Sequence, residues 1–171
     1  THNRQAYSVL GNHDYGDYTT WESSEKKQEN FEAIEAVLNE SGFWLLNNAS
    51  AVIKRNSDSI FVAGVENWGH PPFPQYANLN KALRNVPAGA FTILMTHDPA
   101  HWESKVKNCG DIELSLSGHT HGMQWGIKLA GIKFSVAYLT NRYWGGLYRH
   151  NKSVLYVNTG LGNVGIPWRM D

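Results

Sequence analysis

Apolar residues along the chain follow two patterns, one typical of helices and one typical of strands. Apolar positions three to four residues apart predict a helix from Thr19 to about Glu40, where Thr19 and Glu22 can form a capping box. Four apolar residues share one face of this helix: Phe31, Ile34, Val37 and Leu38. The dipeptide Ser41-Gly42 is expected to end the helix, because glycine is the usual residue just past a helix C-terminus.

Short apolar runs bounded by glycine, proline or polar residues predict strands through the rest of the chain. These runs cover residues 6–10, 43–46, 51–55, 59–65, 91–95, 112–116, 133–138, 147–150 and 154–157. Tight turns at residues 56–58 and 151–152 predict two hairpins, and short helices are expected at 79–86 and 99–107. The order of these elements predicts an α/β fold, a layered α/β sandwich with mixed sheets, in a single domain over residues 1–171.

Composition narrows the classes of function. The chain has 15 basic and 15 acidic residues, and this zero net charge argues against a protein that binds nucleic acid by bulk electrostatics. A substrate that carries phosphate is still compatible, because a bound metal can supply positive charge. The single cysteine, Cys109, excludes an internal disulfide framework. No run of about 18 apolar residues is present that would span a membrane.

Histidine clusters directly follow three of the predicted strands. They are Gly11-Asn12-His13-Asp14, Thr96-His97-Asp98-Pro99 and Gly118-His119-Thr120-His121. The ends of neighbouring strands lie along one edge of an α/β sheet, so these polar groups are expected to converge. Imidazole nitrogen with amide and carboxylate oxygen suits Mn, Fe, Zn, Ni or Co. The two imidazole rings of residues 119–121 could serve two different ions rather than bind one together.

In this order, the three motifs resemble the later motifs of the calcineurin-like metallophosphoesterases. The segment Asn158-Thr159-Gly160-Leu161-Gly162 resembles the last active-site loop of that family, and the resemblance runs from about Gly11 to Gly162. Gly122-Met123-Gln124 adds a similarity to bacterial phosphodiesterases of the type thought to act on nucleotide-lipid or other phosphodiester substrates. The resemblance implies a four-layer αββα fold and a metal-dependent phosphoester hydrolase, with phosphodiesters favoured as substrates.

The resemblance also implies a role for each polar residue of the motifs. The implied metal ligands are Asn12, His97 and His119 for the second ion and His121 for the first. His13 would be catalytic and face the scissile phosphate, while Asp14 would belong to the catalytic loop and orient it. Two divalent ions (Mn, Fe, Zn or Ni) and a bridging hydroxide would complete the binuclear centre.

The chain departs from the family pattern at its start. The family's Asp-x-His and Gly-Asp motifs are missing, since only residues 1–10 precede Gly11. We therefore expect an N-terminally truncated piece with at most a partial metal site, and we expect activity of the longer parent protein. Two alternatives stay open: a non-catalytic or degenerate domain of this fold, and a nuclease of this fold. Truncation would expose an edge or face of the sheet, which predicts self-association.

Other features are interpreted without a motif. His70, His101 and His150 are taken as surface or loop residues. The aromatic, proline-bearing segment of residues 66–73 could overhang the metal site or could be ordinary loop packing. The compartment of the parent is left open between cytoplasmic and membrane-associated.

Overall fold

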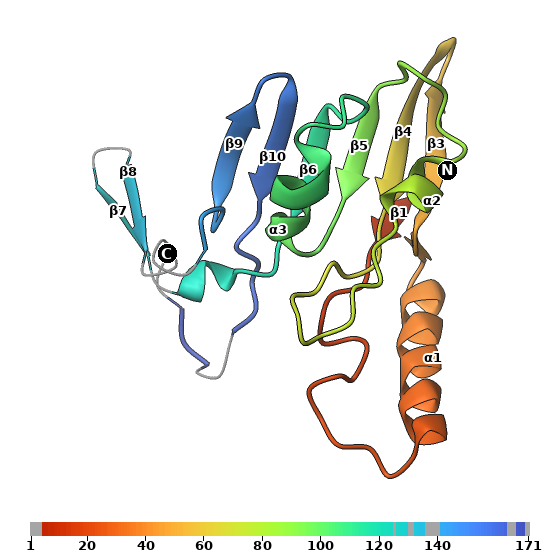
Figure 1. Cartoon of the computed structure of the whole chain (residues 1–171), viewed down its shortest axis with the longest axis vertical. Helices are drawn as coiled ribbons and strands as arrows, with labels where there is room; N and C mark the ends of the chain where they lie inside the picture. The colour runs from red at the N-terminus through yellow and green to blue at the C-terminus, as the bar shows by residue number, and fades with distance from the viewer. Residues whose placement is uncertain (1–4, 125, 130–131, 136–140, 164–166, 170–171) are drawn as a thin grey trace.

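The computed structural model describes residues 5–124, 126–129, 132–135, 141–163 and 167–169. Its largest element is a six-stranded mixed sheet in the order β3-β4-β5-β6-β10-β9 (Figure 1). The strands are β3 (Ala49–Arg55), β4 (Asp58–Gly64), β5 (Thr92–Met95), β6 (Leu114–Ser117), β9 (Gly146–His150) and β10 (Ser153–Val157). The four inner strands are parallel, and β3 and β9 pair antiparallel at the two edges. The predicted α/β fold is confirmed.

Smaller elements flank this sheet. Strands β1 (Ala6–Ser8) and β2 (Phe43–Leu45) form a parallel pair, and β7 (Gly126–Leu129) and β8 (Ile132–Ser135) form an antiparallel pair. The helical elements are α1 (Ser24–Glu40), α2 (Leu79–Leu83), α3 (Pro99–His101), a π-helical turn (Trp102–Val106) and a 3₁₀ turn (His121–Gln124). Helix α1 and the β7–β8 hairpin lie at opposite ends of the molecule (Figure 1).

Both predicted hairpin turns are confirmed, and both use asparagine in a left-handed conformation. In the first, Arg55 pairs with Asp58 across a two-residue turn in which Asn56 has φ +55°. In the second, β9 and β10 are joined through Asn151, with φ +53°. Asparagine tolerates this region better than most residues with a side chain, which explains why these positions read as turns. The sequence did not predict β7.

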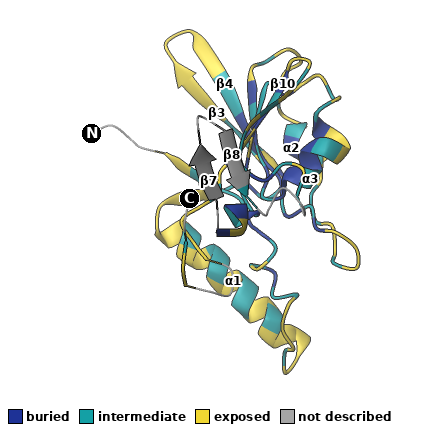
Figure 2. Cartoon of the chain, turned by 90° about the vertical axis from the view of Figure 1, so that its left-hand side faces the viewer, coloured by how far each residue is buried: buried dark blue, intermediate teal, exposed yellow. Residues whose placement is uncertain are grey.

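Helix α1 begins later than its periodicity predicts. The predicted start at Thr19 is wrong, because the helix begins at Ser24 and the Ser23 hydroxyl caps it by accepting from the Lys26 N–H at 3.3 Å. Residues before Ser23 serve the preceding loop instead, where the Trp21 indole N–H donates to the Gly16 carbonyl at 2.8 Å. The apolar face is only half-buried, and no residue of α1 is fully buried (Figure 2).

The core lies on one face of the large sheet, where α2 and α3 cover it (Figures 1 and 2). Its buried members are Ala63, Val65, Ala82, Leu94, Trp102, Val106, Ile112, Leu155 and Val157. The surface interpretation of His101 is wrong: it is 1% exposed, and its Nδ1 lies 3.1 Å from the Thr96 hydroxyl. It is buried because α3 starts directly after β5 and turns this ring toward the sheet.

Candidate metal centre

The site lies where three neighbouring parallel strands end. His97 follows β5, His119 follows β6, and residues 158–162 follow β10, in the order in which these strands lie in the sheet. Backbone hydrogen bonds link the three strand ends: the Gly118 N–H donates to the His97 carbonyl at 3.0 Å, and the Asn158 N–H donates to the Ser117 carbonyl at 2.8 Å. The predicted convergence is therefore confirmed for the histidine clusters after β5 and β6, and the segment after β10 joins them.

Asn12 reaches the same place from outside the large sheet. Strand β1 does not pair with that sheet, but the chain after it lies tightly against β4 and β5. A Cβ added to Gly64 would lie 2.8 Å from Val9 Cγ1, and one added to Gly11 would lie 2.7 Å from His97 Cε1. Two glycines without side chains thus let the loop of residues 11–14 sit directly against His97.

Three donor atoms from three separate segments meet at this point. His97 Nε2 lies 2.9 Å from Asn12 Oδ1 and 3.0 Å from His119 Nδ1. The other end of the amide is held by Tyr18, because Asn12 Nδ2 donates to the Tyr18 hydroxyl at 2.8 Å. A neutral imidazole nitrogen carries either one proton or one lone pair, so His97 Nε2 can make only one good hydrogen bond of the two. Protein hydrogen bonds alone leave this cluster poorly satisfied.

A divalent cation fits the cluster. Two donors that bind one ion at about 2.1 Å, at right angles, lie roughly 3.0 Å apart, which matches both separations measured from His97. His121 supplies a further free donor: its Nδ1 is buried and has no hydrogen-bond partner among the described residues. The fit is partial, since no group of three or more His, Cys, Asp or Glu side chains in that part of the chain is arranged to hold an ion. One of the three converging donors is an amide, and no carboxylate joins them.

The histidines of the cluster are in the protonation state that binds metal. Burial, with the neighbouring His119, His121 and His13 acting in the same direction, lowers the pKa of His97 to about 3. Burial also lowers the pKa of His119, although the Asp98 carboxylate opposes this shift. Both imidazoles are therefore neutral at pH 7 and have a lone pair to donate.

The backbone around His119 and His121 is left-handed and not extended. His119 has φ +69° and His121 has φ +50°, a left-handed region that costs free energy for a residue with a side chain. The conformation is held by Thr120, whose hydroxyl donates to the Trp144 carbonyl at 2.6 Å. Service of two different ions by these two rings stays a prediction.

The loop of residues 11–14 is held by a hydrogen bond within it, and a cavity lies next to it. The Asp14 carboxylate accepts from the Gly11 N–H at 2.7 Å, a contact that suits the orienting role expected of it. Tyr15, the next residue along the chain, lines a cavity of about 350 Å³ together with Tyr76 and Glu66. The rings of Tyr15 and Tyr76 stack with their centroids 4.1 Å apart. The Tyr15 hydroxyl donates to the Glu66 carboxylate at 3.3 Å, and burial raises the pKa of both groups.

The loop after β10 lies beside His121, as expected for a last active-site loop. A Cβ added to Gly162 would lie 3.4 Å from His121 Cε1. Arg169 connects the two segments, because its guanidinium donates to the carbonyls of His121, Thr159 and Gly162 at 3.0–3.3 Å. No motif marked Arg169, which reaches the site only through tertiary folding.

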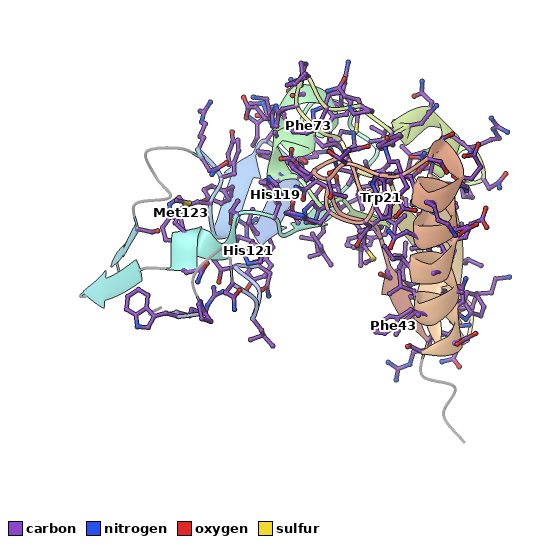
Figure 3. All side chains as sticks on the ribbon, turned by 90° about the horizontal axis from the view of Figure 1, so that it is seen from below. Trp21, Phe43, Phe73, His119, His121 and Met123 are labelled. Atoms are coloured by element: carbon purple, nitrogen blue, oxygen red, sulfur yellow. The ribbon has the colours of Figure 1, made fainter. Side chains whose placement is uncertain are left out.

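Three further residues near the site had no assigned role. Tyr18 contacts Asn12 and stacks on His13, and the ring of Phe73 lies 4.6 Å from that of Tyr18. Phe73, in the segment of residues 66–73, therefore contacts the residue that stacks on His13. His70 is exposed, as interpreted, but its Nε2 lies 3.2 Å from the Asp98 carboxylate. For Tyr18 the one available signal is its position in the same loop as His13. Figure 3 shows Phe73, His119, His121 and Met123 on the face seen from below.

Comparison with known proteins yields a consistent set of matches. The family model described as "Calcineurin-like phosphoesterase" matches residues 2–123. The chain is 31% identical to a protein from Danio rerio called "Transmembrane protein with metallophosphoesterase domain", over 96% of this chain and 36% of that protein. It is 27% identical to "Uncharacterized metallophosphoesterase YkoQ" of Bacillus subtilis, over 96% of this chain and 55% of that protein. The related YkuE of the same organism is 26% identical, over 94% and 50%.

This chain thus spans about a third to a little over a half of the length of these relatives. No solved structure matches it significantly. Relatives from Danio rerio and Bos taurus are named as transmembrane proteins. In the described part of this chain, no helix is long and apolar enough to cross a membrane.

Proposed function

This chain belongs to the calcineurin-like phosphoesterase family, and on that premise we propose that it carries one half of the binuclear metal centre of a phosphodiesterase. Membership of the family supports a metal-dependent phosphoesterase as the general activity. The number of ions, their identity and the preference for diesters are part of the proposal. The activity is proposed for the longer protein to which such a chain corresponds.

The observation that supports the proposal is that two donor atoms, Asn12 Oδ1 and His119 Nδ1, each lie within 3.0 Å of His97 Nε2. Asn12 Oδ1, His97 Nε2 and His119 Nδ1 would hold one ion, and His121 would hold the other. Mn, Fe, Zn and Ni all suit imidazole with amide oxygen. When bound, such ions lower the pKa of water and neutralise charge on the phosphoryl oxygens.

The remaining residues of the motifs would act on substrate or support the groups that do. His13 would stabilise a phosphoryl oxygen or protonate the leaving oxygen, since it follows Asn12 directly on the same loop. Asp14 would hold that loop through the Gly11 N–H. His97 and His119 stay neutral because they are buried, so they would bind metal without first losing a proton.

The substrate is proposed to be a phosphodiester that is not nucleic acid, since the chain has no excess of basic residues for a polyanion. Membrane association is proposed for the longer protein, because two relatives are named as transmembrane proteins.

A second candidate function is a degenerate binding domain. It is favoured by the lack, among the described residues, of a cluster of three or more His, Cys, Asp or Glu side chains around an ion.

The test is the metal content of the chain, by elemental analysis after dialysis against Mn²⁺ and then against metal-free buffer. We expect about one ion per chain, and its loss in His97→Ala and in His119→Ala. His150→Ala is the matched control, because the ring of His150 is hydrogen-bonded to Asn108 in another part of the molecule. An unmodified chain that retains no ion would refute the half-site. Retained Mn²⁺ without hydrolysis of bis(4-nitrophenyl) phosphate by a longer protein would favour the binding domain.

A further inference from the structure

Tyr18 contacts two residues of the site at once although no motif includes it. Its hydroxyl accepts a hydrogen bond from Asn12 Nδ2 at 2.8 Å. Its ring stacks on the ring of His13, with centroids 4.8 Å apart and an interplanar angle of 26°. The side chain is nevertheless 50% exposed, so burial in a core does not account for its position.

The hydroxyl contact holds the Asn12 side chain with its oxygen toward His97. An asparagine amide has one oxygen and one NH₂ group of similar size, and only the oxygen can bind a cation. With Nδ2 donating to Tyr18, Oδ1 lies 2.9 Å from His97 Nε2. Rotation of the amide by half a turn would put NH₂ at that point and remove one of the three converging donors.

The ring contact limits the freedom of His13. Tyr18 in turn packs against Phe73, with centroids 4.6 Å apart and an interplanar angle of 33°. His13, Tyr18 and Phe73 thus form a row of three rings that joins the catalytic loop to the loop after β4. Stacked rings favour one relative orientation over others, so the row restricts the orientations open to the His13 imidazole.

We propose that Tyr18 is a positioning residue with two separable actions: its hydroxyl orients the Asn12 amide for metal binding, and its ring orients His13. This inference rests on the proposed metal half-site. The two actions belong to different atoms of one side chain, so substitutions can separate them. Tyr18→Phe removes only the hydroxyl, and Tyr18→Leu removes both the hydroxyl and the ring.

The first measurement is Mn²⁺ affinity of the whole chain, followed by the electron paramagnetic resonance signal of free Mn²⁺. Both variants should bind Mn²⁺ about tenfold more weakly, the lower end of the range for losing a residue that orients a metal ligand. The second measurement is the NMR shift of the His13 ring protons without metal. Tyr18→Phe should keep the ring-current shift, and Tyr18→Leu should lose it. Tyr7→Phe is the matched control, since its hydroxyl donates to Gln5 away from the site.

A double-mutant cycle separates this role from a general loss of structure. Asn12→Ala removes the amide that the Tyr18 hydroxyl holds, so the hydroxyl has no metal ligand left to position. In that background Tyr18→Phe should leave Mn²⁺ affinity unchanged within twofold, whereas with Asn12 present it costs about tenfold. The melting temperature without metal should be the same for Tyr18→Phe and the unmodified chain.

Each outcome bears on a different claim. If the unmodified chain binds Mn²⁺ and Tyr18→Phe binds it equally well, the positioning role is overturned and the metal half-site stands. An equal loss with Ala at position 12 would also overturn it. If the unmodified chain binds no Mn²⁺, both the half-site and the inference fall.

Discussion

Gly11 offers the sharpest single test of how the cluster is assembled. A Cβ built on Gly11 would lie 2.7, 2.8 and 3.0 Å from Cε1, Nδ1 and Nε2 of His97. Non-bonded carbon contacts are comfortable at about 3.5–4.0 Å, so the imidazole in Gly11→Ala must retreat by roughly 0.8 Å. Metal–ligand distances tolerate only about 0.2 Å of deviation. The added methyl group should therefore disrupt the contacts of His97 Nε2 with Asn12 and His119.

We expect Gly11→Ala to weaken Mn²⁺ binding by at least about tenfold. Overpacking should cost about 1–3 kcal/mol of folding stability, which lowers the melting temperature of a chain of this length by roughly 2–10 °C. Gly118→Ala is the matched comparison, because a Cβ there would meet only the Asn158 carbonyl oxygen, at 3.8 Å. It should have a much smaller effect on both quantities.

Mn²⁺ affinity can be followed by titration and the melting temperature by differential scanning calorimetry on the same samples. The reasoning would be refuted if Gly11→Ala bound Mn²⁺ as tightly as the unmodified chain. It would also be refuted if Gly118→Ala lost as much affinity as Gly11→Ala, since the effect would then follow from any added methyl group near the site.

Three further predictions concern the rest of the chain. Burial lowers the pKa of His101 from 6.5 to about 4, so the unfolded chain takes up a proton first as the pH falls. The free energy of unfolding should therefore decrease between pH 6.5 and about pH 4, and urea titrations should show a smaller decrease in His101→Gln. Trp102→Phe removes the indole N–H bond to the buried Ser153 hydroxyl, at 2.9 Å, and should cost about 2–4 kcal/mol in the same titrations. Val37 and Trp44 are 61% and 52% exposed, so light scattering should detect self-association that Trp44→Lys reduces; a monomer at all concentrations would refute this.

Local pattern was sufficient to predict most of the fold. The apolar runs predicted β5, β6, β9 and β10 within a residue or two. For the inner strands β5, β6 and β10 the reason is that buried parallel strands need continuous apolar sequence. Both hairpin turns were predictable because turn geometry depends on the few residues that form it. The start of α1 was missed for the opposite reason: Ser23 and Thr19 are both good caps, and the choice was made by the loop contacts of residues 16–21.

The candidate site was predictable as a set of residues and not as an arrangement. The motifs identified Asn12, His97, His119 and His121, and their places just after predicted strands implied that they would converge at one edge of the sheet. The sequence did not imply the 2.9 Å distance between Asn12 Oδ1 and His97 Nε2. Asn12 follows a strand outside the large sheet, and its position depends on close packing at Gly11.

Only the tertiary structure decided which residues support these groups. Tyr18, Phe73 and Arg169 contact the site from three segments, and none carries a local signal that separates it from an ordinary surface aromatic or basic residue. The left-handed backbone at His119 and His121 likewise depends on a hydrogen bond from Thr120 to the distant Trp144. Residue type and spacing determine what chemistry a chain can perform. Contacts between residues far apart in sequence determine whether the donor atoms reach one point, because local sequence does not encode those distances.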